Sequence, residues 1–151
     1  MNTKPVFEKI DFVNKYESIC KNHNDYENSM SGNNHELYSN LIKKLGYKAK
    51  YYKGETFYRI EEKIDDTTYG FQLTLKNGLV ETMIDTKYDK NWCTPDGRLD
   101  FLCEDLDSNF DRDTYNLPKY TSEEELEIIL KEIFSLYEDY KLALKEHLAK
   151  V

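Results

Sequence analysis

Cysteine and histidine are the residue types in this chain best suited to hold a metal ion. His23 follows Cys20 by three positions, and His35 lies twelve positions further on. Zinc sites use such ligands, but they need four of them, usually in closely spaced pairs, and here the fourth ligand and the pairing are absent. We therefore predict no metal site, with Cys20 in the core and both histidines in solvated loops.

Cys20, Cys93 and Cys103 are also the candidate nucleophiles, but no local nucleophile signature surrounds any of them. The sequence contains no phosphate-binding loop, dinucleotide fingerprint, nucleophile elbow or zinc-protease motif. An odd number of cysteines at unrelated spacings favours reduced thiols, as expected of a cytoplasmic protein. We accordingly predict no catalytic residues, no cofactor and no enzymatic activity.

Acidic residues are concentrated between positions 96 and 113, where seven of eighteen residues are Asp or Glu. Their spacing does not match an EF-hand calcium loop. Asp105, Asp107, Asn109, Asp111 and Asp113 are all odd-numbered, so a β-strand would place them on one face. The stretch fits a solvated acidic loop, a docking surface for a basic protein, or a metal or acid–base site. We predict the docking surface, formed by Asp96, Asp100, Glu104, Asp105, Asp107, Asp111 and Asp113.

Aromatic residues are abundant, with thirteen tyrosines and one tryptophan. Tyrosine serves both protein cores and interfaces, and we expect those on or beside the predicted strands to pack mostly in the core or on the sheet. Trp92 differs because it lies in a polar segment just before the acidic stretch. We predict that it anchors the docking surface.

The net charge is -8, from 21 basic and 29 acidic side chains, and the acidic excess falls in residues 51–151. Such a surface repels nucleic-acid phosphates and anionic lipids and attracts basic partners. No apolar run approaches the ~20 residues of a membrane span, and the N-terminus lacks the features of a secretory signal. We expect a cytoplasmic protein that binds a basic protein partner, with no direct nucleic-acid or membrane contact.

The N-terminal third has helical character. Residues 6–20 place apolar side chains at helical spacing and predict a first helix. Residues 21–34 are rich in Asn, Ser and Asp and predict a loop. Residues 35–45 predict a second helix, which Gly46 would end in a left-handed cap.

From Tyr47 onward the apolar period changes to two, which predicts strands at 47–52, 55–64, 68–76 and 79–87. Asn77-Gly78 between the last two is the strongest hairpin signal known. An antiparallel meander is the simplest arrangement of these strands. After the turn-like Pro95-Asp96-Gly97, a fifth strand is expected at Leu99–Cys103.

The last element begins at a capping box, in which Ser122 precedes Glu125 by three positions. An apolar stripe then continues for about seven helical turns and should pack across one face of the sheet. Residues 1–151 are thus expected to form a single α+β domain, an antiparallel four- to five-stranded meander flanked by N-terminal helices and a long C-terminal helix.

The chain resembles the immunity proteins of bacterial polymorphic-toxin and contact-dependent growth inhibition systems. The segment NLPKYTSEEELEIILKEIFSLYEDY, from Asn116 to Tyr140, looks like the C-terminal helix of several such families. The acidic charge, the Tyr/Asn/Lys-rich composition and the helix-flanked meander are similar too. The resemblance implies a stoichiometric inhibitor that occludes the active site or partner surface of a cognate toxin, often a nuclease.

Two other functions stay open. A small enzyme or ligand-binding domain would use a tyrosine-lined concave face of the sheet. A secretion chaperone or adaptor shares the acidic charge and the α+β layout, and a stable homodimer would support it. The oligomeric state is not predicted from the sequence.

Overall fold

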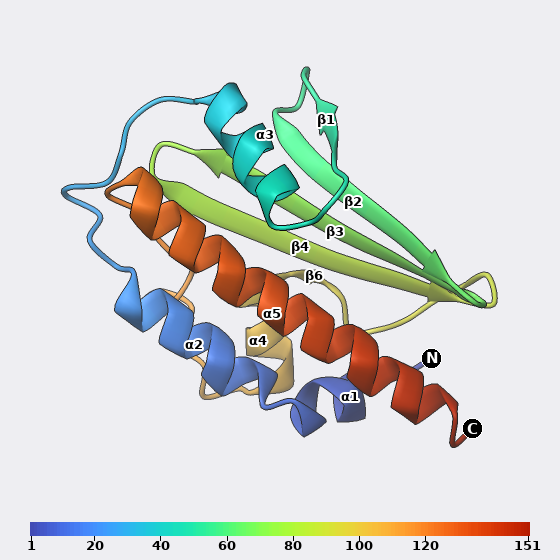
Figure 1. Cartoon of the computed structure of the whole chain (residues 1–151). Helices are drawn as coiled ribbons and strands as arrows, with labels where there is room; N and C mark the ends of the chain where they lie inside the picture. The colour runs from blue at the N-terminus through green and yellow to red at the C-terminus, as the bar shows by residue number, and fades with distance from the viewer.

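Alternating inward and outward side chains build one antiparallel sheet (Figure 1). In the computed structural model, which describes residues 1–151, the four main strands pair in sequence order, which confirms the predicted meander. They are β1 (Lys50–Tyr52), β2 (Phe57–Ile64), β3 (Thr67–Lys76) and β4 (Leu79–Tyr88). Two further strands of two residues each, β5 (Asn91–Trp92) and β6 (Gly97–Arg98), both pair with β4.

The turn between β3 and β4 is the predicted one. Asn77 and Gly78 have φ angles of 53° and 76°, and Lys76 pairs directly with Leu79. A two-residue turn with both φ angles positive matches the twist of the flanking strands, and Asn-Gly adopts it at least cost.

The predicted first helix is wrong in one respect, because it is two helices, α1 (Lys4–Lys9) and α2 (Phe12–Asn22). Asp11 between them has a φ of 56°, a left-handed conformation that Asp tolerates better than most residues. The bend lets Phe7 stack on Tyr140 at 4.7 Å between ring centroids while Phe7 also meets Phe12 edge-on at 4.9 Å. Both short helices therefore contact the core.

The other two predicted helices are confirmed as α3 (His35–Lys44) and α5 (Glu123–Leu148). The Ser122 hydroxyl accepts a hydrogen bond from the backbone N–H of Glu125 at 3.1 Å. The Glu125 carboxylate in turn accepts from the backbone N–H of Thr121 at 2.8 Å. The start of α5 is thus capped from both sides, as its sequence indicates.

The predicted fifth strand at Leu99–Cys103 is wrong, because this segment is part of a helix, α4 (Leu99–Leu106). Leu99, Leu102 and Cys103 are buried. Their spacing of three and four residues is helical, and it outweighs the turn signal before it.

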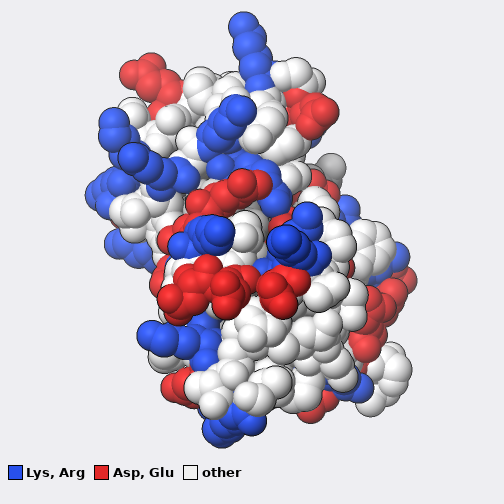
Figure 2. Space-filling model, turned by 90° about the vertical axis from the view of Figure 1, so that its right-hand side faces the viewer, with Lys and Arg blue, Asp and Glu red and all other residues white.

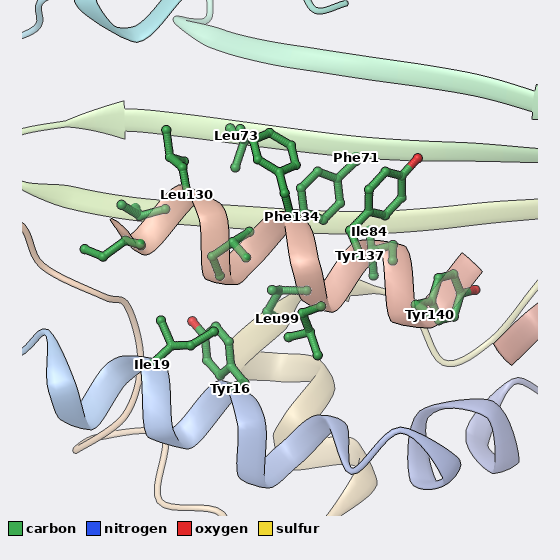
Figure 3. Packing of buried hydrophobic residues seen from close by; sticks show 14 of the residues in the cluster. Tyr16, Ile19, Phe71, Leu73, Ile84, Leu99, Leu130, Phe134, Tyr137 and Tyr140 are labelled. Carbon is green, nitrogen blue, oxygen red and sulfur yellow. The ribbon is translucent and has the colours of Figure 1, made fainter. Parts of the chain in front are cut away.

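The core lies between the sheet and α5, which crosses one face of it (Figure 1). Figure 3 shows Phe134 and Tyr137 of α5 facing the strands, with Tyr16 and Ile19 of α2 on the other flank. The rings of Phe71 and Tyr137 stack with centroids 4.2 Å apart. We call the face under α5 the inner face and the opposite face the outer face. None of the helices combines the length and apolar character that a membrane crossing needs.

Candidate partner-binding surface

Trp92 is positioned by a tight turn at the end of β4. Asp89 and Lys90 have φ angles of 47° and 70°, and this turn brings Trp92 opposite Lys87. Lys87 alternates with the buried Thr86 and so belongs to the outer face. Its ammonium lies 4.3 Å from the centroid of the indole ring. The Trp92 side chain remains 53% exposed.

Phe101 is a second exposed aromatic side chain, on the first turn of α4, and it is 43% exposed. Two guanidinium groups bracket its ring, that of Arg98 at 4.5 Å and that of Arg112 at 4.3 Å from the centroid. Each contact is a cation–π interaction that holds the ring in place.

Asp100 holds both arginines. Its carboxylate accepts hydrogen bonds from Arg98 Nε at 2.6 Å and Nη2 at 2.7 Å, and Arg112 Nη1 lies 3.8 Å away. Arg98 also pairs with Glu81, with Nη1 2.9 Å from Oε1, and Arg112 pairs with Glu104, with Nε 3.4 Å from Oε2. The hydrogen bond to Asp100 raises the pKa of Arg98 above its ordinary value. We call this set the Phe101 cluster; it comprises Glu81, Arg98, Asp100, Phe101, Glu104 and Arg112.

The predicted role of Asp100 needs correction, because this side chain is 0% exposed. A carboxylate that is buried and paired with Arg98 is not accessible to a partner. The reason is local: Asp100 follows Arg98 by two positions, and the fork of the guanidinium matches the carboxylate.

The other predicted acids are exposed, but no strand aligns them. The segment after α4 consists of turns, so the strand that would align Asp105 with Asp113 does not exist. Asp107 accepts from the backbone N–H of Asn109 at 2.9 Å. Asp111 accepts from the Thr114 hydroxyl at 2.6 Å, and this bond lowers the pKa of Asp111. The remaining exposed acids of the stretch are Asp96, Glu104, Asp105 and Asp113.

The sheet brings Trp92 and the Phe101 cluster to the same edge. Trp92 pairs with Lys87, and Arg98 pairs with Met83, four residues back along β4. Four residues of strand span about 13 Å. Both partners on β4 are outer-face residues. Trp92 and the Phe101 cluster thus border one strand, and we call this region the β4-edge surface.

Charge is mixed on the side of the molecule that carries the turn from β2 to β3 and the turn from β4 to β5. Figure 2 shows a band of Asp and Glu across the middle of this side, with Lys and Arg predominating above it. The net charge of -8 is therefore not spread evenly over this side of the surface.

The candidate metal ligands do not converge. His23 lies between two glutamates of α5, with Nδ1 2.8 Å from Glu125 Oε2 and Nε2 3.4 Å from Glu132 Oε1. His35 lies elsewhere and stacks on Tyr51, with ring centroids 4.0 Å apart. Cys20 is buried in the core, as predicted, but His23 is buried too and is not a solvated loop histidine. No group of three or more His, Cys, Asp and Glu side chains is arranged to hold a metal ion.

The three thiols are free and buried. Burial raises the pKa of Cys20 to about 12 and raises those of Cys93 and Cys103 as well. A thiol needs the thiolate form to act as a nucleophile, so these environments disfavour that chemistry.

Most of the inner face of the sheet is covered by α5, and a small hollow of about 250 Å³ beside α3 has two tyrosines, Tyr47 and Tyr58, in its lining. Seven tyrosines are buried in the core: Tyr16, Tyr38, Tyr58, Tyr69, Tyr120, Tyr137 and Tyr140. A larger hollow of about 620 Å³ lies between α2 and α5, and we call it the α2–α5 groove. Its lining is mainly polar and contains no tyrosine.

Sequence reasoning missed Phe101, Arg98 and Arg112. One signal was present in the sequence: Arg98 and Arg112 are the only two basic residues between positions 96 and 113. Two lone arginines inside an acidic stretch indicate internal ion pairs, and the acids they neutralise are not available to a partner.

Comparison with protein families, curated proteins and solved structures finds no match to this chain.

Proposed function

We propose that this chain is an immunity protein, which neutralises a cognate basic toxin domain by stoichiometric binding, and that the toxin domain is a nuclease. The observation that carries the proposal is the pair of exposed aromatic side chains, Trp92 and Phe101, beside exposed acids on the β4-edge surface. Interface energy concentrates in a few aromatic and arginine anchors, while surrounding charges set specificity and association rate.

The anchors differ in how firmly they are held. Phe101 is fixed between two arginines that Asp100 orients. An anchor ordered before binding loses less conformational entropy when the partner arrives. Trp92 rests on the single Lys87 ammonium. This arrangement supports protein binding without any catalytic apparatus.

Charge supports the choice of partner. A nuclease domain is basic because it meets phosphate, and an inhibitor with a net charge of -8 is attracted by the same field. Exposed Glu104, Asp105 and Asp107 lie on or directly after α4, beside Phe101. They would face the basic partner around the aromatic anchor.

The test is growth rescue together with binding kinetics. The probe is the product of the gene adjacent to the one for this chain: cells in which that product is toxic should grow when the chain is co-expressed. Trp92→Ala should speed dissociation at a cost of about 2 kcal/mol, since an anchor acts after encounter. Tyr26, which is 65% exposed on a distant loop, supplies the matched control, and Tyr26→Ala should bind like the parent.

Two results would contradict the proposal at different levels. Failure of the parent chain to bind the toxin or protect the cells would remove the immunity function. Protection that is equally strong with Trp92→Ala and Phe101→Ala would move the binding site away from the β4-edge surface. Binding to a secreted protein without protection from any toxin would favour the adaptor or chaperone alternative.

A further inference from the structure

The sheet has one edge that the rest of the chain leaves open. The far edge of β4 pairs with β5 and β6, and Leu79 at its start forms a bridge with Lys119. The opposite edge of the sheet is β1, which pairs with β2 on one side and with no strand on the other. Figure 1 shows no element beyond β1 on that side.

The register of the strands shows which backbone groups face this open edge. Hydrogen-bonded pairs alternate along an antiparallel ladder, and Ile64 and Thr67 form such a pair because they close the two-residue turn between β2 and β3. Even-numbered residues of β2 therefore exchange hydrogen bonds with β3, and odd-numbered residues face β1. Tyr51 lies opposite the even-numbered Tyr58, so the N–H and C=O of Tyr51 point away from the sheet.

The two residues before β1 also have free backbone groups. Lys48 and Ala49 form no backbone hydrogen bond with any other part of the chain. We call residues 48–51 the β1 edge. A peptide that lies extended along the β1 edge would satisfy these groups, as an added strand does in other sheets.

The β1 edge has a hollow on each face of the sheet. The inner hollow, of about 250 Å³, lies beside α3, and Ile42, Ala49 and Tyr58 form its apolar part. The outer hollow, of about 350 Å³, is mainly polar, and Lys48 and Lys50 contribute to it. Successive side chains of a strand point to opposite faces, so an added strand would place them alternately in the two hollows.

Positive charge surrounds the β1 edge. Four exposed lysines here form no ion pair within the chain: Lys43, Lys48, Lys50 and Lys53. The one acid that lines either hollow, Glu61, already pairs with Arg59 at 3.0 Å. Lys and Arg also predominate in the upper part of Figure 2, at the height where Figure 1 places β1.

We propose that the β1 edge binds an extended segment of another protein in which acidic and apolar residues alternate, and that this segment joins the sheet as a further strand. Its acidic side chains face Lys48 and Lys50 in the outer hollow. Its apolar side chains enter the inner hollow beside Ile42 and Tyr58. Backbone hydrogen bonds supply affinity, and the two hollows supply specificity.

Charge favours this partner over two others. Lysines on an edge strand discourage pairing between copies of one protein, because a second copy brings its own lysines to the same edge. Nucleic acid is attracted to lysines, but its phosphates only accept hydrogen bonds. A peptide strand both donates and accepts them, as the backbone of the β1 edge does.

The proposal does not rest on the immunity function. In the strand order of the sheet, β1 and β4 lie on opposite sides of β2 and β3, so the β1 edge is separate from the β4-edge surface. An acidic segment and a basic toxin domain would be able to bind at the same time.

The first experiment compares three labelled octapeptides with blocked ends by fluorescence polarisation. The probe alternates glutamate and valine, the second peptide alternates lysine and valine, and the third is the probe with every backbone amide N-methylated. The probe should bind the parent chain, and both other peptides should bind at least about tenfold more weakly. The lysine peptide has the wrong charge, and the N-methylated peptide has no hydrogen-bond donors.

The second experiment locates the site on the chain. Lys48→Glu combined with Lys50→Glu should weaken binding of the probe by about tenfold, because it reverses the charge beside the outer hollow. Lys21→Glu combined with Lys145→Glu is the control, since it changes the net charge equally at exposed sites on α2 and α5, and it should weaken binding far less. Hydrogen exchange followed by NMR should show that the Tyr51 amide becomes protected when the probe binds.

Each outcome decides the proposal. Absence of binding by the probe overturns it, and so does equal binding of the lysine peptide or of the N-methylated peptide. Equal effects of the two double variants, or a Tyr51 amide that stays unprotected, also overturn it because the probe then binds elsewhere. A single-stranded oligonucleotide of the same net charge that binds more tightly than the probe would make this a phosphate-binding surface instead.

Discussion

The carboxylate of Asp100 is the side chain on which the Phe101 cluster depends. It is the only fully buried acid of the core, and it pairs with Arg98 and Arg112, which in turn bracket Phe101. Removing one partner of a buried ion pair leaves the other without compensation, and this costs more than losing an exposed pair.

We therefore expect Asp100→Ala to lower the free energy of unfolding by about 2–3 kcal/mol, less than for a fully buried pair because both arginines reach solvent. Glu104→Ala is the control, since Glu104 is exposed and contacts the same Arg112, and it should change stability by at most about 0.5 kcal/mol. Urea unfolding measures both. Equal effects of the two variants would contradict the assigned role of Asp100.

Glu62 gives the protein a defined response to acid. Burial alone would raise the pKa of Glu62, but hydrogen bonds from Lys141 at 2.8 Å and from the Tyr137 hydroxyl at 2.6 Å lower it overall. A group whose folded pKa is lowered stabilises the protein above its unfolded pKa of about 4.3, and that contribution is lost as pH falls through the folded value.

Glu62→Gln should therefore lose stability at neutral pH and show a shallower further loss below about pH 4.3. Glu55→Gln, at an exposed site without an ion pair, should follow the parent profile. Unfolding free energies across a pH series provide the measurement, and a Glu62→Gln profile parallel to the parent would refute this account.

At the scale of elements, α5 has one side buried in the core and one side exposed to solvent. Ile133 is fully buried in the core, whereas Ile128, five residues earlier, is about half exposed on the outward side. The same substitution at these two sites compares a core position with a surface position of one helix. Burial of an unpaired carboxylate is among the most damaging changes to a core.

Ile133→Asp is expected to abolish the cooperative thermal transition. Ile128→Asp should keep a parent-like midpoint, because Ile128 is about half exposed and surface changes alter stability by about 0.5 kcal/mol or less. Circular dichroism melts compare the two variants. A parent-like melt for Ile133→Asp would be incompatible with α5 packing on the sheet.

At the scale of the whole molecule, charge acts before contact. Steering depends on the field at the approaching surface and weakens as salt screens it. Asp105, Asp107 and Asp111 are exposed acids close to Phe101 in the chain. Asn keeps one acceptor oxygen, which can still accept from the backbone N–H of Asn109 at position 107 and from that of Asp113 at position 111.

Replacing these three residues by Asn should slow association with the toxin domain and flatten its salt dependence, with folding unchanged. A triple variant at Glu27, Glu36 and Glu55 to Gln removes the same charge from exposed sites elsewhere and should slow association less. Stopped-flow binding at two salt concentrations compares them. Equal rates for the two triple variants would mean that net charge alone steers the encounter.

The sequence by itself determined the elements whose signals are local. The Asn77-Gly78 turn, the alternating strands around it and the Ser122 cap of α5 are specified by neighbouring residues, because hydrogen-bond and φ preferences act over a few positions. These signals were enough for the α+β class and the meander. The exposed Trp92 also fits its polar surroundings in the chain.

Only the tertiary structure decided which charges are free. Asp100 and Asp105 look alike in the sequence, yet one is buried by Arg98 and Arg112 and the other is exposed. The break between α1 and α2 likewise follows from Phe7 packing on Tyr140, 133 positions away in the chain. The neighbouring Arg98 indicates an ion pair, but the burial of Asp100 depends on which distant residues pack around it, and a local pattern carries no record of that.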